Sequence, residues 1–202
     1  MLINSSRLKN CPVLSLHVGG MIARTNEIII DPNELKVVAF HLEGPQVGNG
    51  EVGDYLQENR VREYSSMGMV VDSVDDFVDG NEVVNLQKIL GLGFSLVGMK
   101  VVTRKGTKLG KVSDYTINTD GFMVQQLIVQ RPIMKSFLDP ELVIGRSEVV
   151  EINDDAIVVR DEESKIRANA TREDFVPNFV NPFREPRLST ADNQTLDESD
   201  TK

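Results

Sequence analysis

One strand-rich pattern occurs twice in this sequence. The segment "VVTRKGTKLGKVSDYTINTDGFMVQQLIVQRP" (101–132) alternates apolar stretches with turn residues, which predicts three strands joined by two turns. A shift of about 87 residues places "LSLHVGGMIARTNEIIIDPNELKVVAFHLEGP" (14–45) on it without a gap. Apolar positions then coincide, and the turn "DPNE" falls on the turn "NTDG". The repeat predicts two copies of one small β unit.

A second match extends each copy. After a one-residue shift, "RVREYSSMGMVVDS" (60–73) lies on "EVVEINDDAIVVRD" (148–161), so that Glu63 falls on Glu151. Each unit is therefore three strands, a variable loop and a closing pair. A unit of about 70 residues buries only about 60% of its unfolded surface. We therefore expect each sheet to close into a barrel and the two barrels to pair.

The remaining segments divide the chain. Apolar residues at helical spacing between 83 and 90 predict a short helix in a connector at 75–95. The first unit then occupies 1–74 and the second 96–161. Residues 162–202 are polar and lack sustained periodicity, which predicts a largely disordered tail. The expected fold is mainly β, with two small β-barrels in tandem and a short helical connector.

The second unit resembles the PRC-barrel domain family. The family pattern is a glycine, a valine pair, a glycine-containing turn, "lGkV.D", and then a turn and an apolar strand. The first unit matches less well, because Ala23, Thr25 and Glu27 replace a glycine, a valine and an aspartate of the pattern. The matching residues of the second unit are Gly98, Val101, Val102, Gly106, Leu109, Gly110, Val112 and Asp114.

This resemblance implies a small, strongly bent β-barrel without catalytic residues. Such barrels occur in a photosynthetic reaction-centre subunit, in a ribosome maturation factor and in stand-alone proteins. The family mostly serves as a protein-docking module. From the resemblance we expect a tandem PRC-barrel protein, with no cofactor and no metal ion.

The composition limits the chemistry of the chain. The formal net charge of −9 argues against general nucleic-acid binding, which needs cations to neutralise phosphates. Cys11 is the single cysteine, so no intramolecular disulfide forms and an oxidising compartment is not implied. The first residues lack the apolar core of a signal peptide, and no stretch has the length of a membrane helix. We expect a cytoplasmic protein.

Few residues are candidates for catalysis. His17 and His41 lie in the first unit without further ligands at metal-site spacing, and Cys11 reads as a small packed residue. The acidic stretch "DDFVDG" (75–80) lacks the spacing of a calcium loop and reads as a solvated, helix-capping cluster. We therefore expect a protein that is not an enzyme.

Two segments are candidate partner-binding sites. The first hairpin of the second unit carries a group of cations, which either dock an anionic partner or only keep the hairpin solvated and block edge pairing. The tail places phenylalanines four residues apart, either as a strap on the barrels, as a linear motif for a partner, or as part of a disordered chain. The residues are Lys100, Arg104, Lys105, Lys108 and Lys111 in the hairpin, and Phe175, Phe179 and Phe183 in the tail.

Three functions fit these observations. The first is a protein-binding adaptor or scaffold, with a homodimer as one form of association. The second is a ribosome-associated assembly or RNA-processing factor that contacts ribosomal protein and RNA through the lysine-rich hairpin. The third is a small-ligand binder in a cleft between the barrels.

Overall fold

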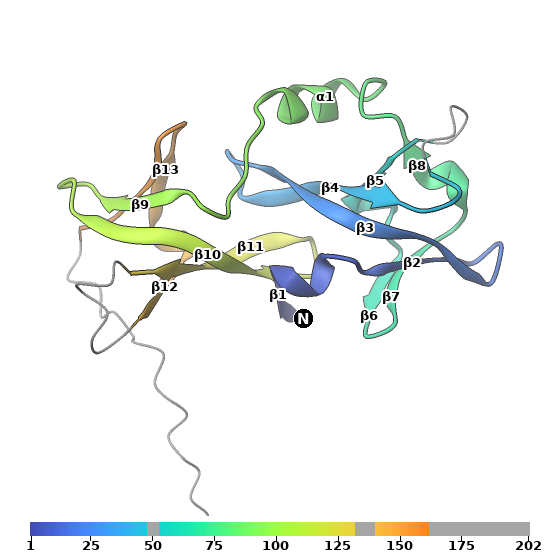
Figure 1. The fold of residues 1–202 in the computed structure, drawn as a ribbon, viewed down its shortest axis with the longest axis horizontal. Coiled ribbons are helices and arrows are strands. Elements are labelled where there is room, and N and C mark those ends of the chain that lie inside the picture. Colours follow the sequence, from blue (N-terminus) through green and yellow to red (C-terminus); the bar gives the residue numbers. More distant parts are fainter. Residues whose placement is uncertain (48–52, 132–139, 162–202) are drawn as a thin grey trace, which may run out of the picture. The chain divides into compact units, whose positions relative to one another are not determined.

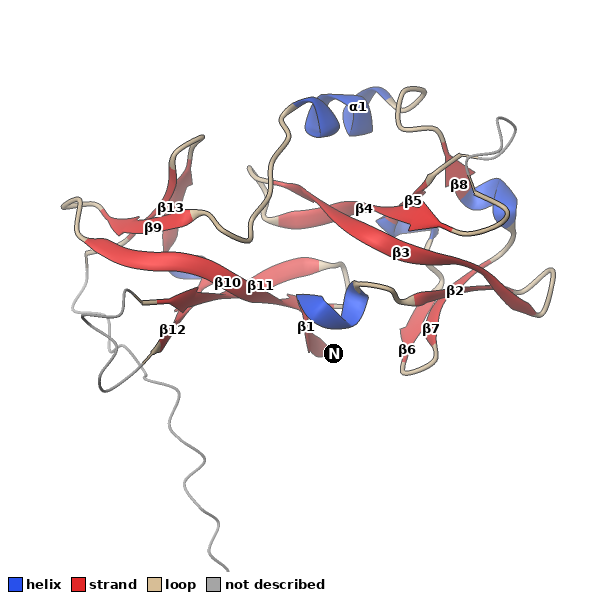
Figure 2. Cartoon of the chain, in the orientation of Figure 1, coloured by secondary structure: helices blue, strands red, loops and turns tan. Residues whose placement is uncertain are grey.

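The computed structural model describes residues 1–47, 53–131 and 140–161. Strands dominate these residues, as Figures 1 and 2 show. The tail predicted at 162–202, with its three phenylalanines, lies outside the described residues.

The N-terminal part alternates short strands with single helical turns. Its elements are β1 (Leu2–Asn4), the 3-10 helix η1 (Ser5–Leu8), β2 (Pro12–Ser15), β3 (Gly20–Asp31), β4 (Lys36–Glu43), β5 (Tyr55–Gln57), η2 (Glu58–Arg60), β6 (Glu63–Ser65), β7 (Gly68–Val71), η3 (Val74–Asp76) and β8 (Phe77–Val78). The helix α1 (Val84–Gly91) follows and buries Leu86, which confirms the short helix expected between 83 and 90.

The second part repeats this order. Its elements are β9 (Lys100–Thr103), β10 (Lys108–Asn118), β11 (Met123–Gln130), β12 (Glu141–Gly145), the 3-10 helix η5 (Arg146–Glu148), β13 (Val149–Ile152) and β14 (Ala156–Val159). We call residues 12–71 the first repeat and residues 100–159 the second repeat.

The strands of the two repeats pair in the same way. In each repeat, four consecutive strands pair antiparallel: β2 to β5 in the first, and β9 to β12 in the second. The last strand then returns beside the first and pairs with it in parallel, so that Val13 faces Met69 and Val101 faces Ile157. The repeated pattern in the sequence therefore corresponds to a repeated pattern of hydrogen bonds.

The irregularities of the long strands also coincide. The ladder between β3 and β4 slips between Thr25 and Glu27, and the ladder between β10 and β11 slips between Val112 and Asp114. Such bulges bend a strand and increase its twist, which curls each sheet. The first strand differs from the gapless alignment by one residue, because Val13, rather than Leu14, takes the place of Val101.

The repeats meet where β4 and β11 begin. Lys36 pairs with Met123, and two further hydrogen bonds flank this bridge. The amide of Val37 donates to the carbonyl of Phe122, and the amide of Val124 donates to the carbonyl of Leu35, both at 2.9 Å. Leu35 and Val37 of the first repeat correspond to Phe122 and Val124 of the second, so each of these two bonds is the equivalent of the other. The two sides of the junction are therefore related by a local twofold axis.

The N-terminal strand crosses from the first part of the chain to the second. β1 pairs antiparallel with β10, with Ile3 opposite Ile117. The buried hydroxyl of Ser5 then donates to a carboxylate oxygen of Asp114 at 2.5 Å. Residues that precede the first repeat therefore fasten onto the second.

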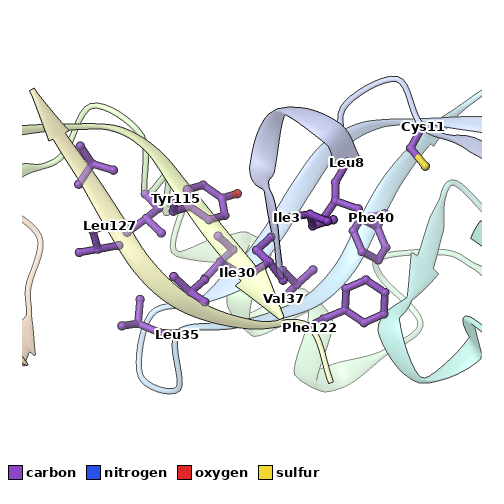
Figure 3. Close-up of a cluster of buried hydrophobic side chains, with 14 of the residues drawn as sticks. Ile3, Leu8, Cys11, Ile30, Leu35, Val37, Phe40, Tyr115, Phe122 and Leu127 are labelled. Atoms are coloured by element: carbon purple, nitrogen blue, oxygen red, sulfur yellow. The ribbon is translucent and has the colours of Figure 1, made fainter. Parts of the chain in front are cut away.

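The hydrophobic core is shared by the two repeats. One cluster of buried side chains contains residues from both, and Figure 3 shows the part of it around the junction. Phe40 and Phe122 pack edge to face across the junction, with their ring centroids 5.4 Å apart. Fully burying an aromatic or aliphatic side chain contributes about 1.5–3 kcal/mol, so this contact stabilises the junction.

The described residues do not confirm the expected closing of each sheet into a barrel. Through the bridge between Lys36 and Met123, their strands form one 14-stranded sheet. This sheet does not close, because β12 and β13 are joined by the turn of η5 and do not pair with each other. A carboxylate oxygen of Glu148 accepts from the amide of Gly145 at 2.8 Å and holds the chain in that turn. The mainly β class is confirmed.

Candidate functional site

The lysine-rich hairpin of β9 and β10, residues 100–111, is the candidate site, and we call it the basic hairpin. Its cationic side chains are all exposed, while Val101 and Val112 beside them are buried in the core. Because successive side chains of a strand point to opposite faces, the two valines hold the hairpin on the core while the cations face solvent. These cations are Lys100, Arg104, Lys105, Lys108 and Lys111.

The turn of the hairpin is firmly held. Gly106 has a φ of +82°, which glycine adopts without a steric penalty, and its amide donates to the carbonyl of Thr103 at 2.8 Å. The amide of Arg104 donates to the carbonyl of Val159 at 3.1 Å, and the amide of Lys105 donates to Asp161 at 3.0 Å. The backbone that carries the cations is thus fixed before any partner arrives.

Two of the cations repel each other. Lys100 and Lys111 face each other directly across the antiparallel pair of β9 and β10. Like charges in this position destabilise a sheet. Within the described residues, none of the five cations of the basic hairpin forms an ion pair. The charge at this site is therefore not neutralised by the part of the chain that the structure describes.

Protection of a sheet edge does not explain Lys100 and Lys111. β9 has β10 on one side and β14 on the other, and Lys100 pairs with Lys111 and with Ala156. Lys111 in turn pairs with Lys100 and with Gln130 of β11. Lysines that discourage edge pairing belong on strands with an open side. These two lie on strands that are already paired on both sides.

The fold does not need the cations either. The equivalent hairpin of the first repeat, β2 and β3, forms with uncharged residues at most of the matching places. Leu16 and Met21 correspond to Arg104 and Lys108, and their side chains are 63% and 54% exposed. One backbone geometry therefore presents an apolar surface in the first repeat and a cationic surface in the second.

Gly110 sets the path of β10 beneath the cations. A Cβ atom at this position would lie 2.1 Å from the carbonyl oxygen of Gln130, and the φ of Gly110 is +157°. The first repeat has Ala23 at the matching place, and there Gly44 on the facing segment gives the room. A close approach between the facing segments is thus present at this place in both repeats.

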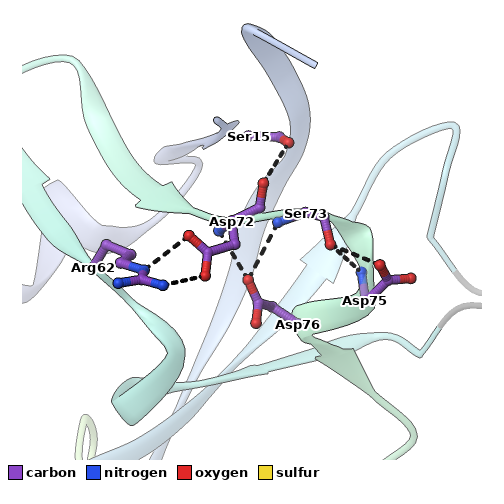
Figure 4. Close-up of polar contacts among 6 residues, drawn as sticks. All are labelled: Ser15, Arg62, Asp72, Ser73, Asp75 and Asp76. Carbon is purple, nitrogen blue, oxygen red and sulfur yellow. Dashed lines mark hydrogen bonds and ion pairs between the residues drawn. The ribbon is translucent and has the colours of Figure 1, made fainter. Parts of the chain in front are cut away.

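The acidic stretch after β7 has a structural role, as expected (Figure 4). The hydroxyl of Ser73 accepts from the amide of Asp75 at 3.1 Å, and Asp76 accepts from the amide of Ser73 at 3.3 Å, which caps η3. Arg62 donates from Nε to Asp72 at 2.8 Å and forms a second bond through its other nitrogen. This pairing lowers the pKa of the Asp72 carboxyl. These carboxylates cap and brace a turn.

The other candidates for chemistry are separated from one another. Cys11 is buried, and burial raises the pKa of its thiol, which fits a packed residue better than a nucleophile. The ring of His41 packs at a tilt of 60° against Tyr55, with ring centroids 5.1 Å apart, and its Nε2 lies 3.8 Å from Asp54. In residues 1–47, 53–131 and 140–161, no group of three or more His, Cys, Asp or Glu is placed to hold a metal ion.

The structure does not describe the other predicted site. Phe175, Phe179 and Phe183 lie outside the described residues, so their role stays a prediction.

Sequence reasoning also did not identify a groove beside β13, which is lined by segments far apart in the chain. In the described part of the chain, no helix has the length and apolar character to span a membrane.

Comparison with known proteins identifies the second repeat. Residues 92–166 match the family model of the PRC-barrel domain. The match includes the basic hairpin, the close approach at Gly110 and all the strands from β9 to β14. No curated protein is similar enough to match the chain. The chain therefore contains a PRC-barrel domain at residues 92–166.

Proposed function

We propose that this protein is a non-enzymatic adaptor whose basic hairpin binds an acidic segment of another protein. The observation that carries the proposal is the direct opposition of Lys100 and Lys111, exposed and without an ion pair in the described residues. Unrelieved repulsion lowers stability, and an anionic ligand bound between the two lysines removes it. The protein-docking role implied by the family supports the same function.

The proposal includes a second, diverged PRC-like domain in the first repeat. Its support is the shared order of strands, the shared parallel pairing and the shared position of the bulges. On this view the two domains act as one rigid body, because they share a core and a junction. A rigid body presents the basic hairpin in a fixed orientation, which suits a scaffold.

The cellular setting is part of the proposal. The acidic composition and the single cysteine fit the cytoplasm. Self-association as a homodimer stays a prediction, for which analytical ultracentrifugation is the measurement.

Binding to two labelled probes tests the function. The first is an eight-residue glutamate peptide and the second is an eight-nucleotide single-stranded RNA, each followed by fluorescence anisotropy at two salt concentrations. We expect the peptide to bind and the binding to weaken with salt. The double substitution Lys100→Glu and Lys111→Glu removes binding, whereas Lys88→Glu on α1 leaves it unchanged.

Each other outcome has a definite meaning. Preferential binding of the RNA, with a steep dependence on salt, favours the ribosome-associated factor over the adaptor. Equal binding of the peptide by the wild type and the hairpin variant contradicts the proposed site.

A further inference from the structure

The strand β13 borders a groove and has an open side. It lies at one end of the hydrogen-bonded strand order and, in the described residues, pairs only with β14. An open edge presents unpaired amide and carbonyl groups to any extended chain that approaches it. β13 carries one charged residue, Glu151, and neither lysine nor proline, which are common protecting residues on such edges.

The hydrogen-bond pattern shows which groups are open. The amide of Asn153 donates to the carbonyl of Ala156 at 3.1 Å, which makes these two residues a hydrogen-bonded pair. Bonded and non-bonded pairs alternate along an antiparallel ladder. The next pair, Ile152 with Ile157, is therefore non-bonded, and the amide and carbonyl of Ile152 face away from β14.

Two adjoining hollows border β13 and the turn that follows it. One has a volume of about 340 Å³ and lies between β13, the side chain of Arg146 and the turn at 32–35. The other has a volume of about 740 Å³ and continues past Ile152 to the segment at 92–100. Pro32, Asn33 and Ile152 line both, so together they form one groove beside the strand edge.

The groove combines exposed apolar side chains with an excess of carboxylates. Leu92 is 59% exposed, Val97 41% and Val150 40%. None of the four carboxylates of the lining forms an ion pair in the described part of the chain, and they outnumber the cations, Lys100 and Arg146. These carboxylates belong to Glu34, Glu151, Asp154 and Asp155.

We propose that this groove binds an extended peptide segment of a partner protein, which adds to β13 as a further strand. The main chain of the segment pairs with Ile152, its alternate apolar side chains cover Val150 and Leu92, and its basic side chains meet the carboxylates. This site goes beyond the adaptor function proposed above. The basic hairpin takes an acidic partner, and the groove takes an apolar and basic one.

The test uses a synthetic probe, an octapeptide that alternates lysine and valine. Saturable binding with a Kd below about 1 mM is expected, together with slower hydrogen exchange at the amides of 149–152. The same peptide with N-methyl groups on alternate peptide bonds keeps its charge and loses half of its donors. This control is expected not to bind.

Paired substitutions locate the site. Glu34→Lys with Glu151→Lys should weaken binding by about fivefold or more, as loss of exposed ion pairs predicts. Glu63→Lys on β6, at the place equivalent to Glu151, should leave the affinity for the peptide unchanged. Substitutions of Lys105 and Lys108 in the basic hairpin should leave it unchanged as well. Circular dichroism confirms that each variant folds.

Three results overturn the proposal. They are the absence of saturable binding, equal binding of the N-methylated peptide, and equal protection of the amides of β6 and β13 from hydrogen exchange when the peptide is added. None of them bears on the basic hairpin, so this proposal and the adaptor function fail independently.

Discussion

Phe122 of the second repeat packs edge to face against Phe40 of the first, with ring centroids 5.4 Å apart. Both rings are buried, and main-chain hydrogen bonds of 2.9 Å flank them on either side of the junction. The contact joins two units that the sequence presents as separate copies. Its loss should therefore affect the whole molecule.

Phe122→Ala should lower the free energy of unfolding by about 3–5 kcal/mol, the usual effect of removing a buried aromatic ring. Urea denaturation followed by circular dichroism measures it. Leu92→Ala, at a side chain that is 59% exposed, is the matched control and should change little. Because the core is shared, we expect one transition. Two separate transitions in the wild type would show that the repeats fold independently.

Gly110→Ala should destabilise the protein by about 1–3 kcal/mol, the usual effect of an added methyl group in a tightly packed site. The new Cβ atom would lie 2.1 Å from the carbonyl oxygen of Gln130. Gly91→Ala is the control, since a Cβ atom there meets nothing within 4 Å. Equal thermal stability of the two variants would contradict the close approach seen at Gly110.

Alkaline pH should destabilise the protein through its buried tyrosine. Burial raises the pKa of the Tyr115 phenol well above its ordinary value of 10.0. The unfolded chain therefore releases this proton first, so stability is complete below about pH 10 and falls as the pH rises further. Tyr115→Phe should flatten this dependence in urea titrations between about pH 9 and 11. An unchanged slope would rule out Tyr115 as the source.

Lys111→Glu should stabilise the protein by about 0.2–1 kcal/mol, because it replaces a like-charged cross-strand pair with an ion pair to Lys100. The same change should weaken the binding of acidic peptides. Lys88→Glu on α1 is the control for net charge. Thermal denaturation and peptide titration of one sample measure both effects. A variant that gains stability and keeps full affinity would indicate that the repulsion has no functional role.

The local structure followed the sequence closely. The pattern of Val101, Val112 and Val124 placed the long strands of the second repeat, and all of these side chains are buried. Helical spacing around Leu86 correctly placed α1. These signals are local, since alternation and helical spacing come from one segment packing on one core.

Pairing between distant segments was not visible in the sequence. The short strands β5 and β12 lie in the variable loops, and their apolar runs are too brief to stand out. The crossing of β1 to β10 joins Ile3 to Ile117, and no local pattern encodes such a partner. The open sheet depends on the turn of η5, where Glu148 holds Gly145. The basic hairpin was found because its charges lie close together in the sequence, whereas the groove beside β13 is lined by separate segments.

The most direct test of the basic hairpin is capture of its natural partner. The protein, immobilised and exposed to a lysate of its own organism, should retain a partner with an acidic segment at low salt. The variant with Lys100→Glu and Lys111→Glu should lose that partner, and the variant with Lys88→Glu should keep it. Retention of the same partner by all three proteins would contradict a functional role for the hairpin.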